Sequence, residues 1–205
     1  MTKNGWRDGK ISVKKLTVSG KMPVQYTIPK TVAYATGAIL TGKDFNASST
    51  ALTHVHVALQ PAYARNLIVC ANAAGTAGHN DYLTITGKDA SGAAISENLY
   101  IKATAAGTTA GSKAFAQVTG IKCHGQTSAN TTVKSTDVGI GYSDTIGLPY
   151  PIASNTDIMT YAYDGAYATT AVDFLTISST YNTLKLPTHA ANKVVTVVYK
   201  TKVQK

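Results

Sequence analysis

The chain has 205 residues, of which 14% are charged and 44% hydrophobic, and its formal net charge is +9. This composition excludes a disordered chain, because disorder combines low hydrophobicity with dense charge. No apolar run reaches the roughly 20 residues that a membrane helix needs, and the polar start MTKNGWRDGK shows no secretory signal. We therefore expect a folded protein that has no membrane partner.

Strand patterns recur along the chain. In chain order, strands are predicted at residues 11–18, 52–59, 66–71, 82–89, 95–103, 113–123, 131–141, 157–163, 171–178 and 193–203. The segment DASGAA (89–94) has the composition of a hairpin turn. Helical periodicity is scarce, and strands at intervals of roughly 10–20 residues with turn residues between them favour a sandwich or barrel. The sequence predicts an all-β fold, an antiparallel β-sandwich or barrel with an extended N-terminal arm and little helix.

The charge is concentrated at the two ends. Residues 1–30 contain seven basic residues and one acidic residue, and residues 185–205 contain five basic residues and no acidic one. Residues 31–184 carry seven basic and nine acidic side chains, so this part is close to neutral. We expect residues 1–30 to form a basic arm and residues 31–205 to form a β-sandwich body. Two prolines in GLPYPIASN predict a subdivision of that body near residues 147–155.

Residues that suit catalysis or metal binding are few. His54 and His56 share one face of the predicted strand 52–59, but a metal site needs a third ligand, and a polar strand face explains them better. Cys70 and Cys123 are predicted to be buried free thiols. The acidic residues form no general acid/base motif, and the chain lacks G-x-S-x-G and a phosphate-binding glycine loop. We expect no enzymatic activity, no metal and no cofactor.

The candidate partner-binding residues are basic or aromatic. Tyrosines gather late in the chain, and tyrosine is enriched at protein interfaces. Arg65 is isolated in the neutral body, which indicates either a surface charge or an interface anchor. The predicted contact residues are Lys3, Arg7, Lys10, Lys14, Lys15, Lys21, Arg65, Tyr161, Tyr163, Lys200 and Lys202.

Two stretches resemble a known family. They are QPAYARNLIVCANAAGTAGHNDYLTITGKDASGAAISENLYI (60–101) and GSKAFAQVTGIKC (111–123), which leads on to VGIGYSDTIGLPYPI (138–152). The order P-x-x-x-R-N-L-x-V, T-I-T-G-x-D-x-x-G, G-x-K-A-F, V-G-x-G and G-L-P resembles tailed-bacteriophage virion structural proteins of the decoration or cement type. The resemblance covers residues 60–152 and brings no catalytic residues with it.

This resemblance implies a function in surfaces rather than in a cleft. The expected protein is a capsid decoration protein, made in the host cytoplasm and placed on the outer surface of the head lattice. Its partners would be the major capsid protein and itself, as a homotrimer, and the basic termini would be steered to acidic capsid surfaces. A tail-tube, connector or fibre-base protein is the first alternative, and a carbohydrate-binding or adhesin module is the second. Nucleic acid is not an expected partner.

Overall fold

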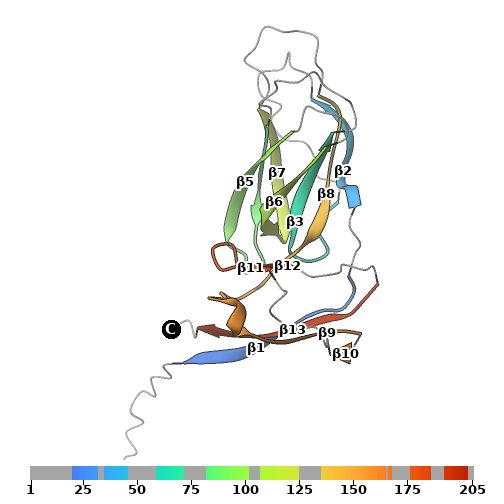
Figure 1. Cartoon of the computed structure of the whole chain (residues 1–205). Helices are drawn as coiled ribbons and strands as arrows, with labels where there is room; N and C mark the ends of the chain where they lie inside the picture. The colour runs from blue at the N-terminus through green and yellow to red at the C-terminus, as the bar shows by residue number, and fades with distance from the viewer. Residues whose placement is uncertain are drawn as a thin grey trace, which may run out of the picture.

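The computed structural model (Figure 1) describes residues 20–31, 35–45, 59–71, 82–101, 107–124, 135–164, 166–167, 176–185 and 192–202. Nearly all regular structure in these ranges is β-strand, joined by one short 3-10 helix. The elements are β1 (Lys21–Ile28), β2 (Ala35–Phe45), β3 (Arg65–Ala71), β4 (Tyr82–Lys88), β5 (Ala94–Tyr100), β6 (Thr108–Phe115), β7 (Gln117–His124), β8 (Ser135–Gly147), η1 (Asn155–Asp157), β9 (Ile158–Tyr163), β10 (Ala166–Tyr167), β11 (Thr176–Ser178), β12 (Thr183–Lys185) and β13 (Val195–Lys202).

Two of the three sheets form a sandwich. The larger sheet has the order β11-β12-β8-β3-β6, with β2 also paired to β8, and the smaller sheet has the order β5-β4-β7. All their pairings are antiparallel. Apolar side chains from both sheets share one core, which includes Leu67, Val69, Leu83, Ile85, Leu99, Phe115, Ile121, Val138 and Ile140. The predicted all-β antiparallel fold is confirmed.

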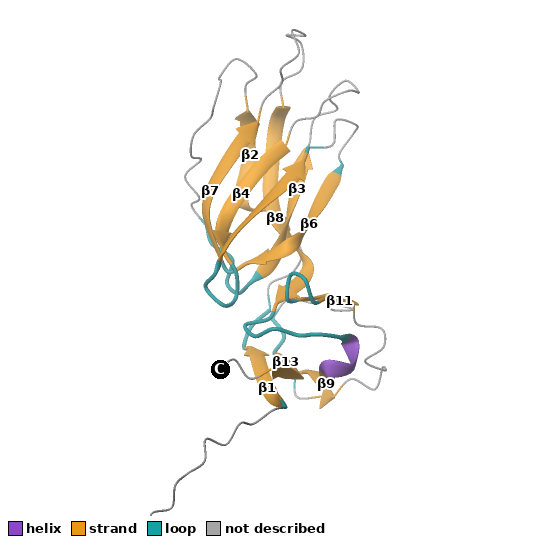
Figure 2. Cartoon of the chain, turned by 90° about the vertical axis from the view of Figure 1, so that its left-hand side faces the viewer, coloured by secondary structure: helices purple, strands orange, loops and turns teal. Residues whose placement is uncertain are grey.

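The third sheet lies beyond one end of the sandwich (Figure 2) and has the order β1-β13-β9-β10. Its own apolar cluster contains Ile28, Tyr161, Val195, Val197 and Tyr199. Ile146, Leu148 and Leu184, at the end of β8 and on β12, belong to the same cluster. The four-stranded sheet is thus joined to the sandwich by shared packing as well as by the chain.

Side-chain periodicity explains most strands. In β4, Leu83 and Ile85 are buried, while Tyr82, Thr84 and Thr86 lie on the opposite face. The hairpin predicted at DASGAA joins β4 to β5. There the Asp89 carboxylate accepts hydrogen bonds from the N–H groups of Ser91 and Ala93, each at 2.9 Å, and Gly92 takes the positive φ of 86° that glycine tolerates best.

Two predicted segments were wrong in part. The sequence predicts an arm over residues 1–30, but Lys21–Ile28 form β1, an edge strand of the four-stranded sheet, and residues 1–19 lie outside the described residues. The single strand predicted at 113–123 is interrupted at Ala116, where β6 ends in the larger sheet and β7 begins in the smaller one. The N–H of Ala116 donates to the carbonyl of Lys88 at 2.8 Å, so a tertiary hydrogen bond fixes this change of sheet.

Candidate interaction surface

The two ends of the chain meet in the four-stranded sheet. β1 and β13 are antiparallel neighbours, with Lys21 opposite Lys202 and Pro23 opposite Lys200. The segment before β1 and the segment after β13 therefore attach to the same end of this sheet. We call this end, where β1 begins and β13 ends, the basic pole. Residues 1–21 and 200–205 contain nine basic residues and one acidic residue, which is +8 of the net charge of +9.

Lys21 is held in place by a buried carboxylate. Its ammonium group forms an ion pair with Oδ1 of Asp157. Asp157 is only 2% exposed. The other oxygen, Oδ2, accepts hydrogen bonds from the backbone N–H groups of Ala153 and Ser154, each at 3.1 Å. Burial disfavours ionisation of Asp157, but the bonds from Lys21, Ala153 and Ser154 outweigh it and hold the pKa of this carboxyl below its usual range.

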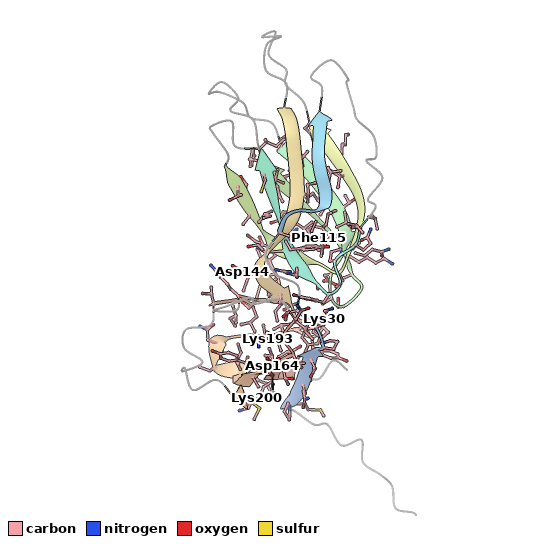
Figure 3. The ribbon with its side chains drawn as sticks, turned by 90° about the vertical axis from the view of Figure 1, so that its right-hand side faces the viewer. Lys30, Phe115, Asp144, Asp164, Lys193 and Lys200 are labelled. Atoms are coloured by element: carbon pink, nitrogen blue, oxygen red, sulfur yellow. The ribbon has the colours of Figure 1, made fainter. Side chains whose placement is uncertain are left out.

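A second ion pair fixes the opposite end of the same sheet. Nζ of Lys193 lies 2.6 Å from Oδ2 of Asp164, and Oδ1 of Asp164 accepts the N–H of Val194 at 2.9 Å. The hydrogen bond from Lys193, followed by that from Val194, lowers the pKa of the Asp164 carboxyl. Figure 3 labels this pair and Lys200 in the four-stranded sheet, and Phe115 within the sandwich. Lys193 is therefore paired locally, whereas Lys200 is exposed at the basic pole.

Arg65 is not at the surface. It is 1% exposed, which corrects the prediction that it is a surface charge or a partner anchor. Its Nε donates to the carbonyl of Ser143 at 3.0 Å. The guanidinium carbon lies 5.5 Å from the ring centre of Tyr63 and 5.1 Å from that of Tyr142. Burial lowers the pKa of Arg65, and the nearby Tyr63, Asp144 and Tyr142 act in the opposite direction. Such a group supports the interior and is not available to a partner.

Asn66 continues the same internal network. The register of β3 against β8 shifts between residues 65 and 67, and its register against β6 shifts between residues 66 and 68. Asn66 serves both irregularities, since Oδ1 accepts the N–H of Thr145 at 3.0 Å and Nδ2 donates to the carbonyl of Gly111 at 2.8 Å. Unpaired backbone groups at bulges are costly when buried. The P-x-x-x-R-N-L pattern therefore supplies side chains that stabilise bulged strands.

The prediction that Tyr161 contacts a partner is also wrong. It is 4% exposed and belongs to the apolar cluster of the four-stranded sheet, so it is a core residue and not a partner contact. Tyr163 lies on β9 opposite Val195. The tyrosines exposed among the described residues are Tyr100, Tyr150 and Tyr181. Their sequence context did not separate them from buried tyrosines, because both kinds occur in strand and turn segments.

An aromatic cluster lies on the outer face of the smaller sandwich sheet. Tyr82 stacks on His124 with ring centres 4.4 Å apart and contacts Tyr100 at 5.7 Å. Oγ1 of Thr84 donates to Oδ1 of Asn98 at 2.8 Å and lies 2.9 Å from Nε2 of His124. With the Thr84 proton directed to Asn98, Nε2 of His124 is the donor to Thr84. Three neighbouring strands thus present an ordered aromatic and polar row, which no sequence pattern indicated.

Several predicted residues lie outside the described residues. These are Lys3, Arg7, Lys10, Lys14, Lys15, His54 and His56. Cys70 is a buried free thiol, as predicted, and burial raises its pKa. In the described ranges, no three His, Cys, Asp or Glu side chains group as metal ligands. No helix within those ranges has the length and apolar character needed to cross a membrane.

Comparisons with known proteins identify no family or relative: no protein-family model, no curated protein and no solved structure matches the chain. The protein is an all-β antiparallel sandwich that carries a smaller sheet built in part from both ends of the chain.

Proposed function

We propose that this protein is a phage virion structural protein, and specifically a capsid decoration protein that binds the outer surface of the head lattice. The observation that carries the proposal is the pairing of β1 with β13, because it brings the residues from which both basic ends continue to one pole of a nearly neutral body. A concentrated positive pole orients a protein on an acidic surface and speeds its association. The resemblance over residues 60–152 supplies the virion context.

In this proposal the two parts of the molecule have different tasks. The basic pole contacts the major capsid protein, and residues 1–19 extend that contact over neighbouring subunits. The sandwich is the body that associates with its own copies as a homotrimer at three-fold positions. Added buried area between capsid subunits then stabilises the lattice against the pressure of packaged DNA.

Removal of the segment before β1 tests the proposal. Deletion of residues 1–30 would also remove β1, so the informative variant lacks residues 2–19 and keeps Lys21 with its Asp157 partner. We expect this variant to fold and to co-sediment with expanded capsids at least about tenfold more weakly, with an effect that shrinks as salt screens the charges. A matched control exchanges the exposed lysines Lys88 and Lys122 of the sandwich for glutamine. Unchanged capsid binding by the deletion variant would refute the role of this segment.

Copy number distinguishes the other virion positions. Hundreds of copies on the head agree with decoration, whereas rings of six or twelve would make this a tail or connector protein. A DNA affinity that falls steeply with salt, in the absence of capsid binding, would instead make it a nucleic-acid binder.

The aromatic row on the smaller sheet favours one second candidate, a carbohydrate-binding module. Tyr100 is 57% exposed, and Asn98 beside it is an exposed amide. Aromatic rings stack on the apolar faces of sugar rings, and amides bond to their hydroxyls. Binding to a glycan array that is lost in Tyr100→Ala, with Tyr150→Ala as the exposed control, would support this function. Absence of binding by the wild-type protein would remove it.

A further inference from the structure

A pocket of about 330 Å³ opens at the basic pole. It lies where the start of β1, the end of β13, the segment before η1 and the turn between β11 and β12 come together. Lys21, Asp157, Ser179 and Lys200 line it, together with the segment 151–153. The pocket thus combines two ammonium groups, one carboxylate, one hydroxyl and a wall that includes Pro151 and Ile152.

The charges inside this pocket do not cancel. Asp157 is already occupied, because Oδ1 pairs with Lys21 and Oδ2 accepts two backbone N–H groups. In the antiparallel pair of β13 and β9, Tyr199 lies opposite Ile158. The next residue of β13 is Lys200, and the residue just before β9 is Asp157, so these two residues lie beside each other. Among the described residues, the ammonium group of Lys200 makes no side-chain hydrogen bond or ion pair. The pocket therefore keeps one positive charge that has no partner.

We infer that this pocket binds a single carboxylate group of an acidic protein segment, with Lys200 as the charge partner. The inference rests on the proposed function, because it specifies the chemistry by which the basic pole recognises an acidic capsid surface. The hydroxyl of Ser179 is a further donor to the carboxylate. Pro151, which is exposed in the pocket wall, supplies apolar surface for the methylene groups of a glutamate side chain.

The same features disfavour a nucleic-acid phosphate as the ligand. The net charge of one does not separate the two ligands, because a phosphodiester and a carboxylate each carry one negative charge, but the kinds of side chain in the lining do. Both cations are lysines, and neither offers the planar fork with which arginine holds phosphate. No aromatic side chain lines this pocket for a base to stack on.

The test is an NMR titration of the full-length protein with N-acetyl-glutamate methylamide. We expect saturable shifts of the backbone N–H signals of Ala153, Ser179 and Lys200, and no such shifts with N-acetyl-glutamine methylamide. Lys200→Gln should weaken binding at least about fivefold, because one charge-assisted hydrogen bond is lost. Lys122→Gln, a matched change of an exposed lysine on β7, should leave the affinity within about twofold.

A second variant tests the charge balance directly. Asp157→Asn leaves both lysines in the pocket without the competing carboxylate, so the affinity for glutamate should rise and inorganic phosphate should begin to bind. If wild-type protein shows no shift at these three N–H groups, or if inorganic phosphate binds it more tightly than glutamate does, the inference is wrong. Equal affinities for glutamate in the wild type and Lys200→Gln would also overturn it.

The outcome is independent of the capsid experiment. Saturable glutamate binding at this pocket without capsid binding would leave the carboxylate site in place and refute the decoration role. Capsid binding that persists unchanged in Lys200→Gln, with no shift on titration, would retain the proposed function and refute the pocket.

Discussion

The sandwich and the four-stranded sheet hold themselves together in different ways. The sandwich uses polar side chains as internal connectors. The buried Arg65 and Asn66 bond to backbone groups at strand irregularities, and the exposed Gln60 makes two hydrogen bonds to the backbone of Val118. The four-stranded sheet instead depends on pairing between segments more than 160 residues apart, and on ion pairs near its two ends. Both ion pairs found among the described residues stabilise this sheet, whereas the sandwich is connected by hydrogen bonds to backbone groups.

This difference has a functional side. Residues 60–152 are the stretch on which the expected virion resemblance rests, and the structure uses its distinctive residues Arg65 and Asn66 for folding. The candidate binding residues are on the other sheet, which contains the basic pole. A rigid scaffold with a separate contact sheet is a common arrangement, since binding residues lie where a rigid framework positions them.

The largest expected loss of stability tests whether the four-stranded sheet unfolds separately from the sandwich. Tyr199 is fully buried in the cluster of the four-stranded sheet, so Tyr199→Ala should cost about 3–5 kcal/mol through the cavity it leaves. Hydrogen exchange measured by mass spectrometry should show lost protection in β1, β9 and β13 first. Equal loss of protection in β3 and β4 would show that the two parts unfold as one unit.

Replacement of Arg65 tests the internal network of the sandwich. Arg65→Ala removes the donor to the Ser143 carbonyl and leaves space between Tyr63 and Tyr142, so we expect a loss of about 2–4 kcal/mol in urea unfolding. The control Lys88→Ala changes an exposed cation on β4 and should stay within about 0.5 kcal/mol. If Arg65→Ala behaved like the control, Arg65 would not be a structural connector.

Gly147 tests the close packing at the end of the sandwich. A Cβ atom at this position would lie 2.8 Å from the Cβ atoms of both Ala64 and Ala114. Gly147→Ala should therefore destabilise the protein by about 1–3 kcal/mol. Gly20→Ala is the matched control, because nothing lies within 4 Å of its added Cβ. Similar thermal melting temperatures for the two variants would contradict this packing.

The smallest effects concern pH, and both arise in the four-stranded sheet. The pKa of Asp157 is lower in the folded protein than in the unfolded chain, so its stabilising contribution is present above about pH 4 and is lost as the pH falls through the folded value. Asp157→Asn should flatten the acid side of the stability curve. A curve as steep as that of the wild type would contradict this role.

At alkaline pH, stability changes with pH in the opposite direction. Burial raises the pKa of Tyr199 to about 12, whereas an unfolded tyrosine ionises near pH 10. The stability contributed by the protonated phenol is therefore present below about pH 10 and is lost as the pH rises towards 12. Tyr199→Phe should remove this decline in urea unfolding measured from pH 9 to 11, and an unchanged decline would assign it to another group.

The sequence by itself determined the fold class, the positions of several strands and the location of the charge. Alternation of apolar and polar residues specifies β4, β5 and β13, because each has one covered face. The turn at Asp89 and Gly92 was equally visible, since its hydrogen bonds are local. The concentration of lysines at both ends was a matter of composition alone.

Tertiary structure decided which of these features act together. No local pattern indicates that β1 pairs with β13, because their register depends on contacts across the whole chain. Burial of Arg65 and Tyr161 was equally invisible, since a charged or aromatic residue in a strand is compatible with either face until its neighbours are known. The basic pole is therefore a property of the fold: the sequence placed the lysines at the two ends, and strand pairing brought those ends together.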